Sequence, residues 1–155
     1  MILLLAVLFG LAGALIRAKV NRSTLKTRDL QLVWLLFAAM IPQIVAFQIP
    51  ATARATPDEL LPYIQILTMI GLLIFALANI KAPGFWALTA GLVMNLAVIA
   101  ANGGWMPITI ETLKRMKPTV AESVLVLGTR AGYSKDMILE LDATKLAILS
   151  DRIVT

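Results

Sequence analysis

The sequence predicts an all-α protein: an integral membrane helical bundle of four transmembrane helices with an amphipathic extracytoplasmic C-terminal tail. Composition is the first reason, because the 155 residues are 59% hydrophobic and only 15% charged, whereas soluble domains are about 45–50% apolar and about 25% charged. The second reason is that four long stretches lack Asp, Glu, Lys and Arg, and a helix needs about 20 apolar residues to cross a bilayer. We expect the transmembrane region over residues 1–101 and the membrane-surface tail over residues 102–155.

The first span is expected at about 1–16, and a basic loop follows it. Positive residues beside a span favour the cytoplasmic side of the membrane and attract lipid headgroups. This pattern predicts that the N-terminus lies outside and that loop 17–28 is cytoplasmic. The side chains expected to contact lipid headgroups are Arg17, Lys19, Arg22, Lys26 and Arg28.

The other three spans are expected at about 30–49, 60–80 and 85–101. Pro42 lies near the middle of the second span and should kink it, because proline removes one helical hydrogen bond and its ring crowds the preceding turn. Alternating sides along the chain place the tail, residues 102–155, outside.

Short motifs bound the third span. Thr56, Pro57 and Glu59 have the spacing of a capping box, in which threonine caps a helix, proline begins it and glutamate bonds back. Residues 81–84, Lys-Ala-Pro-Gly, predict a tight turn, so the third and fourth spans should form a helical hairpin.

The tail is expected to contain two short helices. Thr109 can cap a helix over residues 110–116. Thr119 and Glu122 form a second capping-box pattern, opening a helix that Gly128 would close. About 50 residues cannot build a large independent core, so we expect the tail to pack on the outer membrane surface or on a partner.

Much chemistry is disfavoured by residue types that the chain lacks. It has no histidine and no cysteine, which are the usual ligands of haem, zinc, copper and iron–sulfur centres. The acidic residues of the tail show no metal-loop or paired-carboxylate spacing. The net charge is +5, and the basic residues lie beside the spans without aromatic residues among them. This pattern disfavours nucleic-acid binding. We expect no cofactor, no metal and no enzymatic activity.

The most distinctive string follows the fourth span and reads Asn-Gly-Gly-Trp-Met-Pro. Its structural interpretation is a helix end and sharp turn, with tryptophan anchored at the headgroup level. Its functional interpretation is a backbone-lined turn that recognises a headgroup, a quinone ring or a partner loop. The candidate partner or ligand contacts are Asn95, Asn102, Gly103, Gly104, Trp105, Met106 and Pro107.

Polar and aromatic side chains also occur within the spans. Polar groups there are costly and usually face a bundle interior or a partner, so they indicate either interhelical hydrogen bonds or a substrate pathway. Aromatic residues near span ends are typical of the membrane–water interface. The intramembrane polar residues are Gln43, Gln65, Thr68 and Asn79, and the expected interface aromatics are Trp34, Trp86, Trp105 and Tyr63.

The order of spans, basic loop and the Asn-Gly-Gly-x-Met-Pro string, followed by Gly-Tyr-Ser-Lys at 132–135 and Ser-Asp-Arg-Ile at 150–153, resembles a family of small uncharacterised bacterial multispan membrane proteins, classed as a domain of unknown function. The resemblance implies a bacterial plasma membrane location with the tail outside, and implies no known activity. Members of that family usually continue into a further apolar span, which would return the C-terminus to the cytoplasm.

Two functions from different classes remain open. The first is a non-catalytic scaffold or accessory subunit of a larger bacterial membrane complex, of an energy-transducing kind such as a respiratory or photosynthetic one, with membrane lipids and other membrane subunits as partners. The second is a small transporter or lipid-handling protein that acts as an oligomer, in which the intramembrane polar residues line a pathway.

Overall fold

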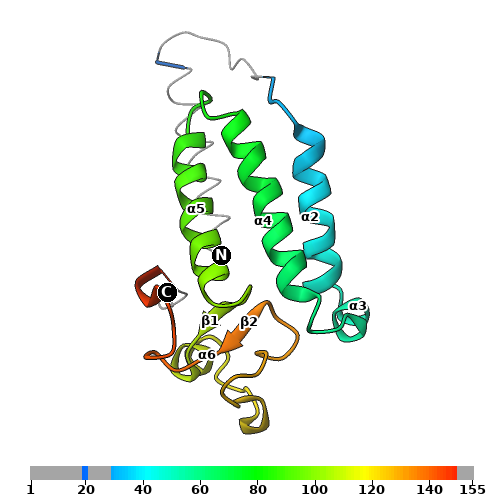
Figure 1. Ribbon diagram of the computed structural model, residues 1–155, viewed down its shortest axis with the longest axis vertical. Coiled ribbons are helices and arrows are strands. Elements are labelled where there is room, and N and C mark those ends of the chain that lie inside the picture. The colour runs from blue at the N-terminus through cyan, green and yellow to red at the C-terminus, as the bar shows by residue number, and fades with distance from the viewer. Residues whose placement is uncertain (1–18, 21–28, 150–155) are drawn as a thin grey trace.

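The structure is a computed structural model that describes residues 19–20 and 29–149. Three apolar helices lie side by side, with α4 between α2 and α5, and shorter elements form a cap at one end of them (Figure 1). The helices are α2 (Val33–Phe47), α4 (Leu61–Ala78) and α5 (Phe85–Ala101). We call these three helices the bundle and residues 102–149 the cap.

Part of the expected membrane region lies outside the described residues. This holds for the first span, 1–16, and for four of the basic side chains of loop 17–28. Lys19, which is described, is exposed. The four basic residues outside the described part are Arg17, Arg22, Lys26 and Arg28.

Most of the bundle helices are shorter than a helix that crosses a membrane. Within the described residues, α4 alone is long and apolar enough to cross a membrane, with 18 residues and a mean hydropathy of 2.1, a length of about 27 Å. Helices α2 and α5 have 15 and 17 residues. The stretch 30–49 is not one helix because Leu32 adopts a left-handed conformation at φ 56° before α2 begins. The expectation of four full-length spans is therefore not met.

Close packing between the bundle helices depends on small residues. A Cβ atom at Gly71 of α4 would lie 3.2 Å from the Cβ of Ala39 in α2, so glycine permits this approach. One turn further along α4, Phe75 meets Phe85 of α5 edge to face, with ring centroids 5.7 Å apart. Such contacts drive helix association where the surrounding solvent is apolar.

The connection between α2 and α4 differs from the prediction. It contains a short helix, α3 (Pro50–Ala55). The capping box before the third span is wrong, because Thr56 ends α3 rather than capping α4, and its hydroxyl donates back to the Thr52 carbonyl at 2.8 Å. Helix α4 begins at Leu61 without a side-chain cap. The turn expected at residues 81–84 is confirmed, with Gly84 at φ 84° immediately before α5.

The cap contains two strands that the all-α prediction did not include. Strands β1 (Met106–Ile108) and β2 (Asp136–Ile138) pair in parallel, with Pro107 opposite Met137. Three residues are too few for alternating hydrophobicity to reveal a strand. The protein is nonetheless mostly helical, in agreement with the predicted class.

The predicted helices of the cap have different outcomes. Helix α6 (Ile110–Met116) has the expected bounds, and the Thr109 hydroxyl accepts from the Thr112 amide at 3.2 Å. The second capping box is wrong, because the chain forms only a 3₁₀ turn, η1 (Glu122–Val124), without a side-chain cap. The last described element is a second turn of this kind, η2 (Ala147–Leu149).

The cap has a small core and is continuous with the bundle. Its own buried cluster comprises Ile108, Leu113, Ala131 and Ile138. Two neighbouring residues join bundle clusters: Trp105 packs with Ala46 and Leu61, and Met106 packs with Met69, Val98 and Ile99. The tail is thus a folded cap seated on the ends of the helices.

Candidate functional site

The Asn-Gly-Gly-Trp-Met-Pro string forms the junction between α5 and β1. Gly103 and Gly104 both have positive φ angles, 69° and 90°. At Gly104 a Cβ would lie 2.3 Å from the Cβ of Pro62 at the start of α4, whereas at Gly103 it would meet nothing within 4 Å. The two glycines therefore turn the chain, and Gly104 also allows the turn to touch α4.

The remaining residues of the string are buried. Trp105 is only 7% exposed, so the expectation that it faces lipid as an anchor is wrong: it packs against Ala46 and Leu61 inside the junction. Met106 and Pro107 are buried as well. The other expected interface aromatics remain exposed, and they are Trp34, Trp86 and Tyr63.

Asn102 binds a distant segment of backbone. Its side-chain amide donates to the Lys145 carbonyl at 2.9 Å and to the Val98 carbonyl at 2.8 Å, and its oxygen accepts from the Lys145 amide at 3.0 Å. All the hydrogen-bonding groups of this amide are thus engaged in holding the cap to α5. We call this arrangement the Asn102 clamp.

Asn79 makes the same arrangement at the opposite end of the bundle. It donates to the Gln31 carbonyl at 2.9 Å and the Phe75 carbonyl at 2.8 Å, and accepts from the Gln31 amide at 2.8 Å. This Asn79 clamp ties the end of α4 to Gln31, two positions before the start of α2. The sequence marked both asparagines as polar candidates but contained no sign of their backbone partners.

The other polar residues expected within the spans meet between helices to differing degrees. Gln43 of α2 donates to the Thr68 hydroxyl of α4 at 2.7 Å, an interhelical bond of the kind expected. Gln65 is 2% exposed, and its Oε1 atom has no hydrogen-bond partner in the described part of the chain. Asn95 makes a long contact of 3.9 Å to the Met69 sulfur.

Sequence reasoning missed Arg130, the most buried cation in the cap. Its side chain is 7% exposed and its guanidinium donates to the carbonyls of Ser134 at 2.6 Å and Tyr133 at 2.5 Å. It also forms an ion pair with Asp58 at 3.1 Å and lies over the ring of Phe47, 5.7 Å from its centroid. The cap therefore shares a charged contact with the segment between α3 and α4, and this contact joins residues 72 positions apart.

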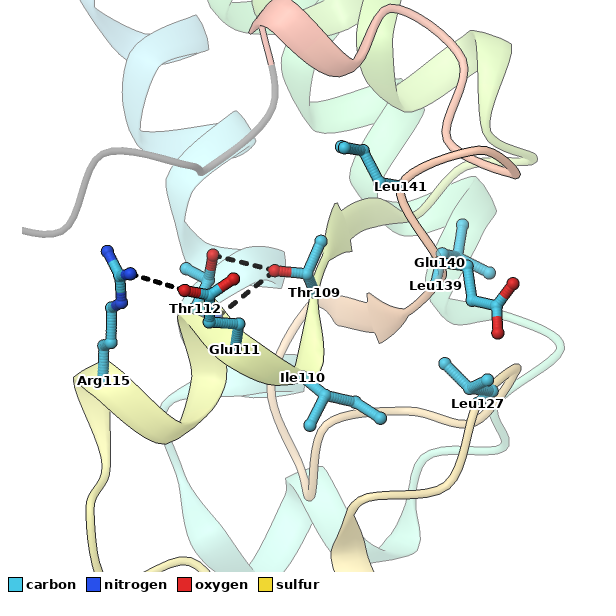
Figure 2. Close-up of a pocket in the computed structure, with 9 residues that line it drawn as sticks. All are labelled: Thr109, Ile110, Glu111, Thr112, Arg115, Leu127, Leu139, Glu140 and Leu141. Carbon is cyan, nitrogen blue, oxygen red and sulfur yellow. Dashed lines mark hydrogen bonds and ion pairs between the residues drawn. The ribbon is translucent and has the colours of Figure 1, made fainter.

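A pocket of about 470 Å³ opens between α6 and the segments that flank it in the cap. Figure 2 shows Arg115 bonded to Glu111 on one side and Glu140 across the pocket; the pair is 2.5 Å long and exposed. The hydrophobic residues lining the pocket are Ile110, Leu127, Leu139 and Leu141.

This pocket can hold an amphipathic molecule, but its side chains do not form an acid–base or nucleophilic arrangement. Its ionisable groups are two exposed carboxylates and one arginine that is already paired, and the Thr109 hydroxyl caps α6. No group of three or more acidic, histidine or cysteine side chains suited to a metal occurs within residues 19–20 and 29–149.

Comparison with known proteins gives one match. No curated protein and no solved structure matches the chain. The model of the Family of unknown function (DUF5317) matches residues 27–155, which include the bundle and the cap. Because this match covers most of its length, the chain belongs to the Family of unknown function (DUF5317).

Proposed function

We propose that the protein is a non-catalytic scaffold or accessory subunit of a larger membrane assembly, and that it docks through the outward face of α5. The observation that carries this proposal is a difference between the outward faces of the bundle helices. Helix α5 exposes five small residues beside four larger ones, Trp86, Leu88, Val93 and Met94. The small residues are Ala87, Ala90, Gly91, Ala97 and Ala100.

The outward faces of α2 and α4 have large side chains. They recur every three or four positions and include Trp34, Phe37 and Ile41 in α2, and Leu67 and Ile74 in α4. Small residues let the backbone of a second helix approach closely, whereas bulky aliphatic and aromatic groups suit contact with lipid chains. The asymmetry supports a protein partner at α5 and lipid at α2 and α4.

Internal hydrogen bonds also favour a structural role over a transport pathway. Gln43 is bonded to Thr68, and the Asn79 amide is fully engaged in its clamp. Groups satisfied in this way stabilise helix contacts by about 0.6–2 kcal/mol each. They are then less available to a passing solute.

The test is gentle detergent extraction from the native membrane, followed by sizing and mass spectrometry of whatever migrates with the chain. We expect stoichiometric co-migration with the subunits of one complex. Ala90→Phe should release the protein from that complex, because the new ring would occupy the space of the partner helix.

Leu67→Phe is the matched control, since it places the same ring on the exposed face of α4, and it should leave the complex intact. Co-migration that survives Ala90→Phe would exclude docking through α5. Migration of the unaltered protein alone would contradict the accessory-subunit proposal as a whole.

One observation favours the alternative, a transporter or lipid-handling protein: the buried side-chain oxygen of Gln65 has no hydrogen-bond partner among the described residues. A buried unsatisfied amide is a place where a polar solute could bind. In that case Gln65→Leu and Asn95→Leu should abolish uptake in proteoliposomes while the protein stays folded, and full uptake by both variants would exclude the pathway.

A further inference from the structure

A second pocket of about 260 Å³ lies where α3 and the loop before β2 meet, at the cap end of the bundle. Charged and polar side chains from both sides of the junction line it. The lining residues are Ala53, Arg54, Thr56, Asp58, Arg130, Gly132 and Tyr133.

Arg130 forms the fixed wall of this pocket. Two backbone carbonyls, the Asp58 carboxylate and the ring of Phe47 hold its guanidinium, and its side chain is 7% exposed. A third carbonyl, that of Ala53, accepts a longer bond at 3.5 Å. A cation held by so many contacts loses little further freedom when it binds an anion, which favours affinity.

Arg54 supplies a second and more accessible guanidinium. It is exposed at the end of α3 and lies over the Tyr133 ring, 5.4 Å from the centroid, which keeps it beside the pocket. It forms no ion pair with any described residue. The pocket therefore combines two arginines with one carboxylate, that of Asp58, which is already paired with Arg130 and is 67% exposed. The local excess of positive charge attracts an anion.

The pocket lies at the end of the bundle, next to the point where the apolar surface of α4 begins. Leu60 and Tyr63, at the start of α4, are 51% and 68% exposed, and an exposed tyrosine at the end of an apolar helix is typical of the membrane–water interface. The volume of the pocket fits a headgroup rather than acyl chains. The Arg54 guanidinium can bind phosphate oxygens through paired hydrogen bonds, whereas Arg130, whose donors are mostly engaged, contributes its positive charge.

We propose that this pocket binds the phosphate ester of an anionic lipid headgroup. Free phosphate shares the chemistry of this group, so the experiment separates the two sources. The lipid as the source rests on the membrane location in the proposed function, whereas the phosphate site itself rests only on the pocket.

Native mass spectrometry of the full-length protein, in micelles containing equal phosphatidylglycerol and phosphatidylcholine, tests the lipid source. The unaltered protein should retain phosphatidylglycerol. Arg54→Gln should reduce that retention by roughly tenfold, the effect of losing one charge-assisted hydrogen bond. Lys114→Gln, which removes an equal charge from α6, away from this pocket, should not change it.

Asp58→Asn tests the sign of the electrostatic effect. This change removes the carboxylate that competes for Arg130, so retention of phosphatidylglycerol should rise while that of phosphatidylcholine does not. Opposite responses to Arg54→Gln and Asp58→Asn cannot come from general unfolding, and fluorescence of buried Trp105 checks that the junction stays intact.

A ³¹P titration with inorganic phosphate provides the second arm. Binding that depends on Arg54 without a preference for phosphatidylglycerol would support the phosphate site and assign it to a soluble source. Equal lipid retention and equal phosphate binding by the unaltered protein and Arg54→Gln would overturn the proposal. Neither arm involves α5, so failure here is distinguishable from failure of the scaffold proposal.

Discussion

The two ends of the bundle are closed by the same device in different surroundings. At each end, an asparagine that follows a helix forms hydrogen bonds with both the backbone amide and the carbonyl of a distant residue. Asn79 binds Gln31, and Asn102 binds Lys145. The next residue after each partner has a left-handed conformation, Leu32 at φ 56° and Leu146 at φ 55°. The amide thus acts as a substitute peptide group that fixes an irregular backbone.

The surroundings determine how much each clamp contributes. Asn79 is 6% exposed and links two apolar helices, whereas Asn102 is half-buried and acts together with Gly104 and Arg130 at the cap. A hydrogen bond lost from a buried, apolar site leaves polar groups without water, whereas one lost near solvent can be replaced. The two clamps form the same hydrogen bonds, but they should therefore contribute different amounts to the free energy of unfolding.

The largest effect is expected at the cap end and is steric. Gly104→Ala should lower the free energy of unfolding by roughly 3 kcal/mol or more, because the new Cβ strains a left-handed residue and overlaps Pro62. Unfolding by sodium dodecyl sulfate, followed by circular dichroism, measures this. Gly103→Ala is the control: it carries the conformational strain without the overlap and should cost about 1 kcal/mol. Equal losses would contradict the packing explanation.

The next effect is expected at the opposite end. Asn79→Ala should lower the free energy of unfolding by about 2 kcal/mol, because it removes three hydrogen bonds, of which the one to the Phe75 carbonyl is buried and the two to Gln31 are partly buried. Hydrogen–deuterium exchange at the Gln31 amide should accelerate in the same variant. A change below that of Asn102→Ala would reverse the ranking of the two clamps.

Asn102→Ala should have a smaller effect, about 1 kcal/mol, since water can reach the released groups. Exchange at the Lys145 amide should accelerate while that at Gln31 stays slow. Trp105 emission, measured with Trp34 and Trp86 changed to Phe, should keep its buried character because other contacts hold the junction. A red shift to the emission of exposed tryptophan would show that the cap is held in place by the Asn102 clamp alone.

The smallest effect is expected midway between the ends, at the bond from Gln43 to Thr68. A double-mutant cycle of Gln43→Leu and Thr68→Val should give a coupling energy of about 0.6 kcal/mol, typical of polar pairs between membrane helices. The Thr68 hydroxyl keeps its bond to the Ile64 carbonyl at 2.7 Å when Gln43 is replaced, which limits the loss. A coupling energy near zero would show that this hydrogen bond adds nothing to the stability that helix packing provides.

Local sequence signals predicted the helices well. The spans expected at 60–80 and 85–101 located α4 and α5 to within two residues, because a helix satisfies its own backbone hydrogen bonds within an apolar stretch and turn residues mark where it ends. Thr109 indicated α6 for a similar reason, since its cap bonds a residue three positions away. The capping box at Thr56 failed because the chain forms α3 just before it, so Thr56 ends that helix and its hydroxyl bonds back to the Thr52 carbonyl.

The candidate site was predicted in part. Asn102, Gly103 and Gly104 were correctly singled out as an unusual turn, because asparagine and paired glycines favour left-handed and irregular backbone. Their contacts with Lys145 and Pro62 were not predictable, since each joins residues 42 or more positions apart and a single sequence carries no distance information. Arg130 escaped notice for the same reason.

The sequence by itself therefore determined an apolar, mostly helical protein without histidine or cysteine chemistry, because composition and short-range hydrogen bonding act within one or two helical turns. Only the tertiary structure decided that the tail folds into a cap, that Trp105 is buried, and that two arginines meet at one pocket. Those outcomes depend on which distant surfaces exclude water from each other, and burial is a property of the whole fold rather than of any segment.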